Sequence, residues 1–157
     1  MKKLLFVSST GGHLKELLQL DPLFEKYEYH IVTEKTKSNS SLKDVYKNKI
    51  SYLVYGTKKN LFSYLFIFSF NWIKSLIIFL KFKPDFIITT GSHTAIPMCY
   101  IAKLFRKKVI YIETFANIYT KTVAGRIAYP IADLFIVQWE SMLKLYPKAI
   151  CGGWIFK

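Results

Sequence analysis

Short apolar runs alternate with amphipathic segments along most of the chain, and this alternation is typical of an α/β protein. The apolar and β-branched runs predict strands near residues 3–8, 28–33, 50–54, 86–90, 108–112 and 134–137. Helical periodicity predicts helices near residues 13–20, 41–47, 60–82, 93–105, 120–130 and 139–145. Such alternation favours a parallel sheet with helices on both faces. Residues 1–157 are therefore predicted to form one domain with a Rossmann-like parallel sheet of about six strands.

The apolar segment at residues 60–82 raises the question of a membrane helix, because it is long enough to span a bilayer. Lysines flank it at both ends, so it lacks the charge asymmetry that orients membrane-spanning helices. The strand predicted at 86–90 must also rejoin a sheet that begins before the segment. We therefore expect a helix in the membrane interface, with part of its apolar surface packed on the sheet. Burial of both apolar flanks by neighbouring helices is the alternative. The polar residues of segment 60–82 fall in one arc of about 120° on a helical wheel: Asn60, Ser63, Asn71, Lys74, Ser75 and Lys81.

Charge and composition support contact with an anionic surface. The net charge is +13, and residues 45–112 hold eleven Lys and Arg but one acid, Asp85. Hydrophobic residues make up 52% of the chain, so the basic residues stand beside long apolar runs. Zinc-finger spacing and RNA-recognition motifs are not found, which favours a membrane surface over nucleic acid as partner. The two cysteines, Cys99 and Cys151, lack metal-binding spacing, so no metal site is predicted.

The first predicted strand leads directly into two glycines and a histidine, Thr10-Gly11-Gly12-His13. Glycine lets a backbone approach a ligand closely, and the unpaired N–H groups of a new helix attract phosphate. The spacing matches neither the dinucleotide fingerprint nor the P-loop. Because open α/β sheets bind ligands at the carboxyl ends of their strands, the turn predicts an anion site that carries an ionisable side chain. A plain strand-to-helix turn capped by His13 is the alternative.

A second turn repeats this arrangement after the strand near 86–90. Thr90-Gly91-Ser92-His93 precedes a helix for which Ser92 is a suitable N-cap. Two helix N-termini at one crevice suit a diphosphate, whereas His93 alone is equally compatible with a solvent-facing loop. Glu113 follows the strand near 108–112, where it is placed to orient a sugar hydroxyl or a histidine. A surface or helix-capping glutamate is the alternative.

The C-terminal residues Gly152-Gly153-Trp154-Ile155-Phe156 combine two glycines with a large apolar cluster. An apolar tail on a small domain is typical of a docking segment. We expect residues 152–157 to dock either onto their own core or onto a partner.

Taken together, five segments resemble those of the PssD/CpsF-type exopolysaccharide proteins. These are the bacterial relatives of the membrane-recruiting subunit of the two-part N-acetylglucosamine transferase of asparagine-linked glycosylation. The segments are residues 8–13, 89–92, 111–113, 135–140 and 152–156. The resemblance covers nearly the whole chain, and the segments follow in the same order. The eukaryotic relatives carry an N-terminal membrane anchor, for which Met1–Leu5 leaves no room, so membrane attachment is expected from 60–82 and the basic block.

The resemblance implies one half of a GT-B glycosyltransferase, similar to the acceptor-binding N-terminal domain of MurG. In this interpretation His13 either acts as general base on the acceptor hydroxyl or positions that hydroxyl, and Glu113 stands nearby as the second catalytic residue. The lipid-linked diphosphate would be held by Thr10, Gly11, Gly12, Thr90, Gly91 and Ser92. The UDP-sugar would bind mainly to a separately encoded partner subunit that docks on the tail, so no cofactor is expected in this chain.

The resemblance also implies capsular or exopolysaccharide synthesis at the cytoplasmic face of the plasma membrane, with a lipid-diphosphate-linked saccharide as acceptor. Two other functions are weighed against this one. The first is a non-catalytic adaptor that recruits or enhances a separate transferase. The second is a stand-alone nucleotide-binding enzyme. It is disfavoured because a suitably placed acid for the ribose is lacking after the second strand, where Glu34 is the only candidate.

Overall fold

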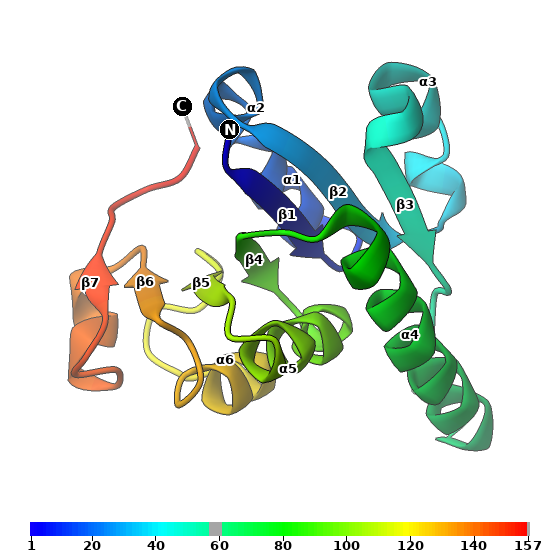
Figure 1. The fold of residues 1–157 in the computed structure, drawn as a ribbon. Helices are drawn as coiled ribbons and strands as arrows, with labels where there is room; N and C mark the ends of the chain where they lie inside the picture. The colour runs from blue at the N-terminus through cyan, green and yellow to red at the C-terminus, as the bar shows by residue number, and fades with distance from the viewer. Residues whose placement is uncertain (57–60, 157) are drawn as a thin grey trace.

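Seven parallel strands form one sheet, in the order β3-β2-β1-β4-β5-β6-β7 (Figure 1). A computed structural model describes residues 1–56 and 61–156, with the side chains of all of these except 61–64. The strands are β1 (Lys3–Ser8), β2 (Glu28–Glu34), β3 (Ile50–Leu53), β4 (Phe86–Gly91), β5 (Lys108–Ile112), β6 (Leu134–Val137) and β7 (Ile150–Cys151). The six predicted strands are confirmed to within one residue at each end. The two residues of β7 are too few to give a sequence pattern.

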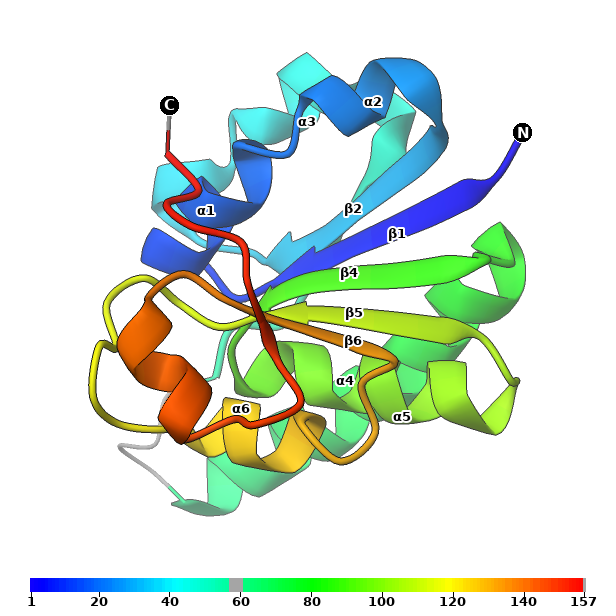
Figure 2. The same cartoon turned by 90° about the vertical axis from the view of Figure 1, so that its left-hand side faces the viewer.

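Helices cover both faces of the sheet, as Figure 2 shows. Alternate side chains of β1 point to opposite faces, so Leu4 and Phe6 belong to one core cluster and Leu5 and Val7 to another. The first cluster lies under α1, α2 and α3, and the second under α4 and α5. The helices are α1 (Gly12–Leu18), α2 (Pro22–Lys26), α3 (Leu42–Tyr46), α4 (Leu61–Phe82), α5 (Ile96–Leu104) and α6 (Val123–Ala128). The predicted α/β architecture is thus confirmed.

The helices differ from the prediction mainly at their ends. Helix α2 is not among the predicted helices, although a Pro in the first turn after Asp21 is typical of a helix start. The predicted helix 93–105 is divided into a 3-10 turn at His93–Ala95 and α5, which has Pro97 in its first turn as expected. The predicted helix 120–130 shortens to α6. The predicted helix 139–145 is a 3-10 helix, Glu140–Lys144.

Helix α4 directs part of its polar arc toward the protein and much of its apolar surface away from it. Asn71 and Ser75 are buried, and Asn71 pairs with both backbone polar groups of Val54 at 2.9 and 2.8 Å. Asn60 and the side chain of Ser63 lie outside the described residues. Exposed apolar side chains follow one another at helical spacing: Phe66, Phe70, Ile73, Ile77 and Leu80. The described stretch Leu65–Phe82 is apolar and long enough to cross a membrane, and 17% of it is buried.

Candidate functional site

His13 lies in the first turn of α1 and is held there by Thr90, at the carboxyl end of β4. The imidazole Nδ1 lies 2.7 Å from the carbonyl oxygen of Thr90, and the Thr90 hydroxyl donates to the carbonyl oxygen of His13 at 2.6 Å. Because a carbonyl oxygen only accepts, Nδ1 carries the ring proton and Nε2 keeps its lone pair in the neutral ring. His13 therefore presents a nitrogen that can accept a proton.

Gly11 and Gly12 form the turn that joins β1 to α1, and both are exposed. Gly11 has a φ of 76°, which favours glycine, and nothing lies within 4 Å of a Cβ built at either position. The Thr10 side chain points elsewhere, since its hydroxyl lies 3.4 Å from the hydroxyl of Thr36. Its N–H lies 3.5 Å from Oε2 of Glu34. The glycine backbone, and not the Thr10 side chain, borders open space.

Gly91 and Thr90 support the site without offering the ligand contacts expected of them. The Gly91 N–H donates to the hydroxyl of Thr89 at 2.9 Å, so it is not available to a diphosphate. The Thr90 hydroxyl is likewise occupied by His13. Gly91 has a φ of 93°, and a Cβ there would lie 3.0 Å from Tyr111 Oη and 3.4 Å from His13 Cε1. The absent side chain is what allows the His13 ring to pack against this turn.

His13 of the first turn and Ser92 and His93 of the second border a cleft of about 300 Å³, which we call the His13 cleft. Its polar lining consists of His13, Ser92, His93, Tyr111 and Thr122. Its apolar lining consists of Phe68, Ile96, Val123, Ala124 and Ile127. The sequence predicts the histidines and Ser92 but not the apolar lining, because helices α4 and α6 reach the cleft only through tertiary packing. A cleft with both linings suits a ligand that has a charged end and an apolar end.

Glu113 is buried at the end of β5, where it positions its neighbours and does not face the cleft. Its carboxylate accepts from the hydroxyls of Tyr146 at 2.7 Å and Thr122 at 2.9 Å, and from the Thr114 N–H at 3.1 Å. Within the described residues no hydrogen bond joins it to His13. Its connection to the cleft runs through Thr122, which caps α6 and lines the cleft. A Cβ at Gly125 would overlap this carboxylate, so a glycine inside the helical segment is the sequence signal that points to this contact.

Burial controls the ionisable groups around Glu113. Burial, followed by the nearby Glu113 carboxylate, raises the pKa of Tyr111 well above its usual value. Burial and the hydrogen bond to Glu113 likewise raise the pKa of Tyr146. Burial also raises the pKa of Glu16, which accepts from the Thr114 hydroxyl at 2.7 Å and from the Gln138 amide at 3.3 Å. Because their pKa values are raised, Tyr111 and Tyr146 are neutral hydroxyl donors at physiological pH.

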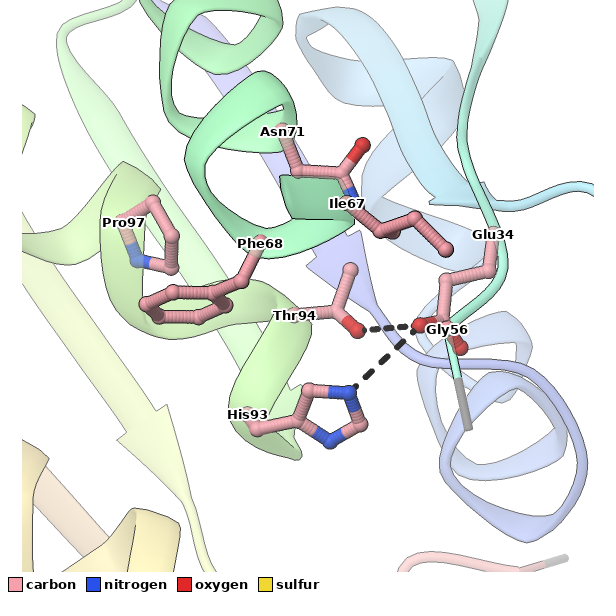
Figure 3. A pocket seen from close by; sticks show the side chains of 8 residues that line it. All are labelled: Glu34, Gly56, Ile67, Phe68, Asn71, His93, Thr94 and Pro97. Carbon is pink, nitrogen blue, oxygen red and sulfur yellow. Dashed lines mark hydrogen bonds and ion pairs between the residues drawn. The ribbon is translucent and has the colours of Figure 1, made fainter. Parts of the chain in front are cut away.

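Ser92 and His93 line the cleft, and His93 also lies next to Glu34, as Figure 3 shows. The Ser92 hydroxyl makes no capping bond, which corrects the expected N-cap; instead it lies 3.1 Å from Nδ1 of His93. Nε2 of His93 lies 3.7 Å from a Glu34 carboxylate oxygen. His93 is therefore part of the site and not a detached loop residue. Within the described chain, no cluster of three or more His, Cys, Asp or Glu residues is arranged to hold a metal.

The tail folds back onto the carboxyl ends of β5 and β6. The Ile155 N–H donates to the Gln138 side-chain oxygen at 3.1 Å. Trp154 packs edge-on against Phe115 and Trp139, with ring centroids 5.3 and 5.5 Å apart. Trp154 is nevertheless 54% exposed. The tail up to Phe156 thus docks on its own domain, which is one of the two expected outcomes. Lys157 lies outside the described residues.

The parallel sheet and the cleft at its carboxyl end define the chain as a Rossmann-like half-domain of the GT-B type. Its fold is similar to that of Acinetobacter baumannii MurG, with a TM-score of 0.73 and 15% identity, over 90% of this chain and 43% of that protein. It is also similar to UDP-N-acetylglucosamine 2-epimerase from Rickettsia bellii, with a TM-score of 0.75 and 16% identity, over 99% of this chain and 45% of that one. The chain thus spans less than half of each solved protein.

The family follows from the sequence match. Residues 4–155 match the family model described as "Oligosaccharide biosynthesis protein Alg14 like", and the chain belongs to this family. It is 27% identical to the UDP-N-acetylglucosamine transferase subunit ALG14 of Mus musculus, over 96% of this chain and 82% of that protein. The predicted kinship with the asparagine-linked glycosylation subunit is thereby confirmed, and the predicted likeness to the MurG fold is confirmed as well.

Proposed function

We propose that this chain is the acceptor-binding, membrane-associating subunit of a two-component, UDP-sugar-dependent glycosyltransferase. The observation that carries the proposal is the His13 cleft, in which a histidine with an available Nε2 stands beside an exposed glycine turn. Membership of the Alg14-like family supports it, because the mouse relative is named as a subunit of a UDP-N-acetylglucosamine transferase. The similarity of the fold to MurG supports a GT-B arrangement, in which we assign the donor site to a partner subunit.

In the proposed reaction, His13 acts as the general base on the acceptor. A sugar hydroxyl becomes an effective nucleophile only when its proton is removed as it attacks. The hydroxyl oxygen forms a bond to the anomeric carbon of the donor sugar, the bond from that carbon to the UDP oxygen breaks, and the proton passes to Nε2 of His13. The bond from Nδ1 to the Thr90 carbonyl holds the ring in the required tautomer.

The acceptor diphosphate is proposed to lie between the two turns. The Ser92 hydroxyl lines the cleft, and the exposed turn at Gly11 and Gly12 adjoins the cleft through His13 and would supply backbone N–H donors. The apolar lining of the cleft, which includes Phe68 and Ile127, suits the first part of a lipid chain. A lipid-diphosphate-linked saccharide combines these features in one molecule.

Membrane attachment is proposed to involve the exposed apolar side of α4. Phe66 is 77% exposed and Ile77 is 60% exposed, which is more apolar surface than a helix in water usually presents. Lys35, Lys43 and Lys74 line a groove beside the helix, where they suit anionic lipid headgroups. We place the subunit at the cytoplasmic face of the plasma membrane, in capsular or exopolysaccharide synthesis, as for the proteins it resembles. We assign docking of the partner to the tail, where Trp154 offers an exposed aromatic ring.

A reconstituted complex tests the function. The chain is purified with the protein of the neighbouring reading frame, and sugar transfer to a prenyl-diphosphate acceptor is measured. His13→Ala should lower transfer by about 10² to 10⁴-fold while co-purification of the partner is unchanged. His30→Ala is the matched control, because His30 lines a different cavity. If His13→Ala retains wild-type transfer, the chain is an adaptor without a catalytic base. If the purified chain transfers sugar alone, the two-component proposal fails.

A further inference from the structure

Glu34 is a buried carboxylate next to the His13 cleft. It lies at the carboxyl end of β2 and is 2% exposed. The Thr94 hydroxyl donates to its Oε1 at 2.7 Å, and Nε2 of His93 lies 3.7 Å from the same oxygen (Figure 3). A buried carboxylate is stable only when donors or a positive charge compensate for the lost water. Glu34 therefore favours the protonated form of the neighbouring imidazole.

His93 separates two cavities. It lines the His13 cleft together with Ser92, and it lines a smaller recess together with Glu34 and Thr94. The His93 side chain is 38% exposed, so a positive charge on its imidazole acts on a ligand in the cleft. Glu34 is the one carboxylate that lines either cavity within the described residues, and His13 and Tyr111 are the other titratable groups that face His93 across the cleft. Glu34 is thus the acid that faces His93 among the described residues lining the two cavities.

We propose that Ser92, His93 and Glu34 form a relay that makes the Ser92 hydroxyl a donor to the diphosphate of the acceptor. This inference rests on the proposed function and adds residues to that site. Glu34 holds the positive charge of His93, and His93 orients Ser92. His93 and Glu34 are positioning residues, whereas Ser92 contacts the ligand.

The direction of one hydrogen bond explains how the relay works. The Ser92 oxygen lies 3.1 Å from Nδ1 of His93, and a hydroxyl has a single proton to donate. When the imidazole is charged, Nδ1–H donates to the Ser92 oxygen, and the hydroxyl proton is free to donate to a phosphate oxygen. When the imidazole is neutral with Nδ1 unprotonated, Ser92 donates to it and shows only lone pairs to the ligand. Protonation of His93 therefore changes Ser92 from a repulsive to an attractive group for an anion.

Binding of farnesyl diphosphate to the purified full chain tests the relay by calorimetry at about pH 6 and about pH 8. Ser92→Ala should weaken binding by about tenfold at the lower pH, because a hydrogen bond to a charged group is lost. His93→Gln and Glu34→Gln should weaken binding similarly at the lower pH. At each of the two pH values, the affinity of both variants should equal that of Ser92→Ala. Glu34→Gln keeps an oxygen for Thr94, so the fold is retained, and circular dichroism verifies this.

The three histidines of the chain allow a clean assignment. His30→Gln should keep the wild-type pH dependence, because His30 hydrogen-bonds Ser51 in another part of the fold. Farnesyl diphosphate itself titrates, so the comparison is always between wild type and variant at the same pH. If His93→Gln binds with wild-type affinity at both values, the relay is refuted while the proposed function stands. If the wild-type chain binds no prenyl diphosphate at either pH, the acceptor site and the relay both fail.

Discussion

Thr90 and His13 hold each other through two hydrogen bonds that run in opposite directions. The His13 ring donates to the Thr90 backbone, and the Thr90 side chain donates to the His13 backbone, at 2.7 and 2.6 Å. One bond fixes the tautomer of the imidazole, and the other fixes the first turn of α1 against the end of β4. A candidate base is thus locked in both orientation and protonation site by a single neighbour.

Thr90→Val should separate these two effects. Valine keeps the shape of threonine and the backbone carbonyl but removes the hydroxyl donor, so the His13 carbonyl loses this hydrogen bond. We expect a loss of about 0.5–1.5 kcal/mol in the free energy of unfolding and a drop in transfer by the reconstituted complex. Thr90→Ser keeps the donor and should retain most of the transfer activity. Equal activity of the two variants would show that the hydroxyl does not position His13.

Gly91→Ala should lower the free energy of unfolding more than Gly153→Ala, which also replaces a glycine of positive φ. A Cβ at Gly91 would meet Tyr111 and His13, whereas a Cβ at Gly153, where φ is 75°, meets nothing within 4 Å. Gly153→Ala therefore isolates the backbone strain, about 1–2 kcal/mol. Gly91→Ala should cost more than this in urea unfolding and should also displace His13, lowering transfer. Identical stability losses in the two variants would contradict the steric role of Gly91.

Glu113→Gln should act on stability first and on transfer second. The amide loses the charge that strengthens the bonds from Tyr146 and Thr122, at a cost of about 1.5–3 kcal/mol per strong bond. Because Thr122 lines the cleft, we expect a moderate fall in transfer, smaller than that of His13→Ala. Thermal unfolding and transfer rates, measured for Glu113→Gln and for His13→Ala, test this expectation. Unchanged stability with abolished transfer would instead return Glu113 to a direct catalytic role.

The sequence predicts the strands well because their patterns depend on local burial. The runs at β1 and β4 are buried and β-branched or apolar, and each ends in a glycine-containing turn. The same locality explains why His13 and Ser92 could be located from sequence. β7 could not be found, because two residues carry no periodicity.

The roles of several site residues could not be predicted, because they depend on partners that are distant in the sequence. Glu113 looks like a ligand-facing carboxylate until Tyr146, 33 positions later, is seen to donate to it. Glu34 stands 60 positions before Thr94, yet the two share a hydrogen bond. The orientation of α4 was similarly hidden, since Asn71 turns inward to satisfy the backbone of Val54 and leaves apolar residues outside.

Phe70→Lys combined with Ile77→Lys should weaken association with anionic vesicles. The two side chains are 53% and 60% exposed on the same side of α4, so the change leaves the core intact. Loss of two buried apolar side chains from an interface costs about 1.5–3 kcal/mol each. Val45→Lys is the matched control, since Val45 is 67% exposed on α3. Sedimentation with vesicles containing anionic lipid measures the effect, and unchanged sedimentation would exclude this side of α4 from membrane contact.

Glu16→Gln should alter the pH dependence of stability in a defined direction. Burial raises the pKa of Glu16 above its ordinary value of 4.5, so the folded state binds this proton more tightly than the unfolded state. The stability contributed by the protonated group is fully present below 4.5 and is lost as the pH rises through the higher folded-state value. The free energy of unfolding of the wild type, relative to Glu16→Gln, should therefore fall across this window. Glu25→Gln on the exposed side of α2 serves as control, and urea unfolding at several pH values gives the slopes. If wild type and Glu16→Gln change in parallel with pH, burial does not raise the pKa of Glu16 in the folded state.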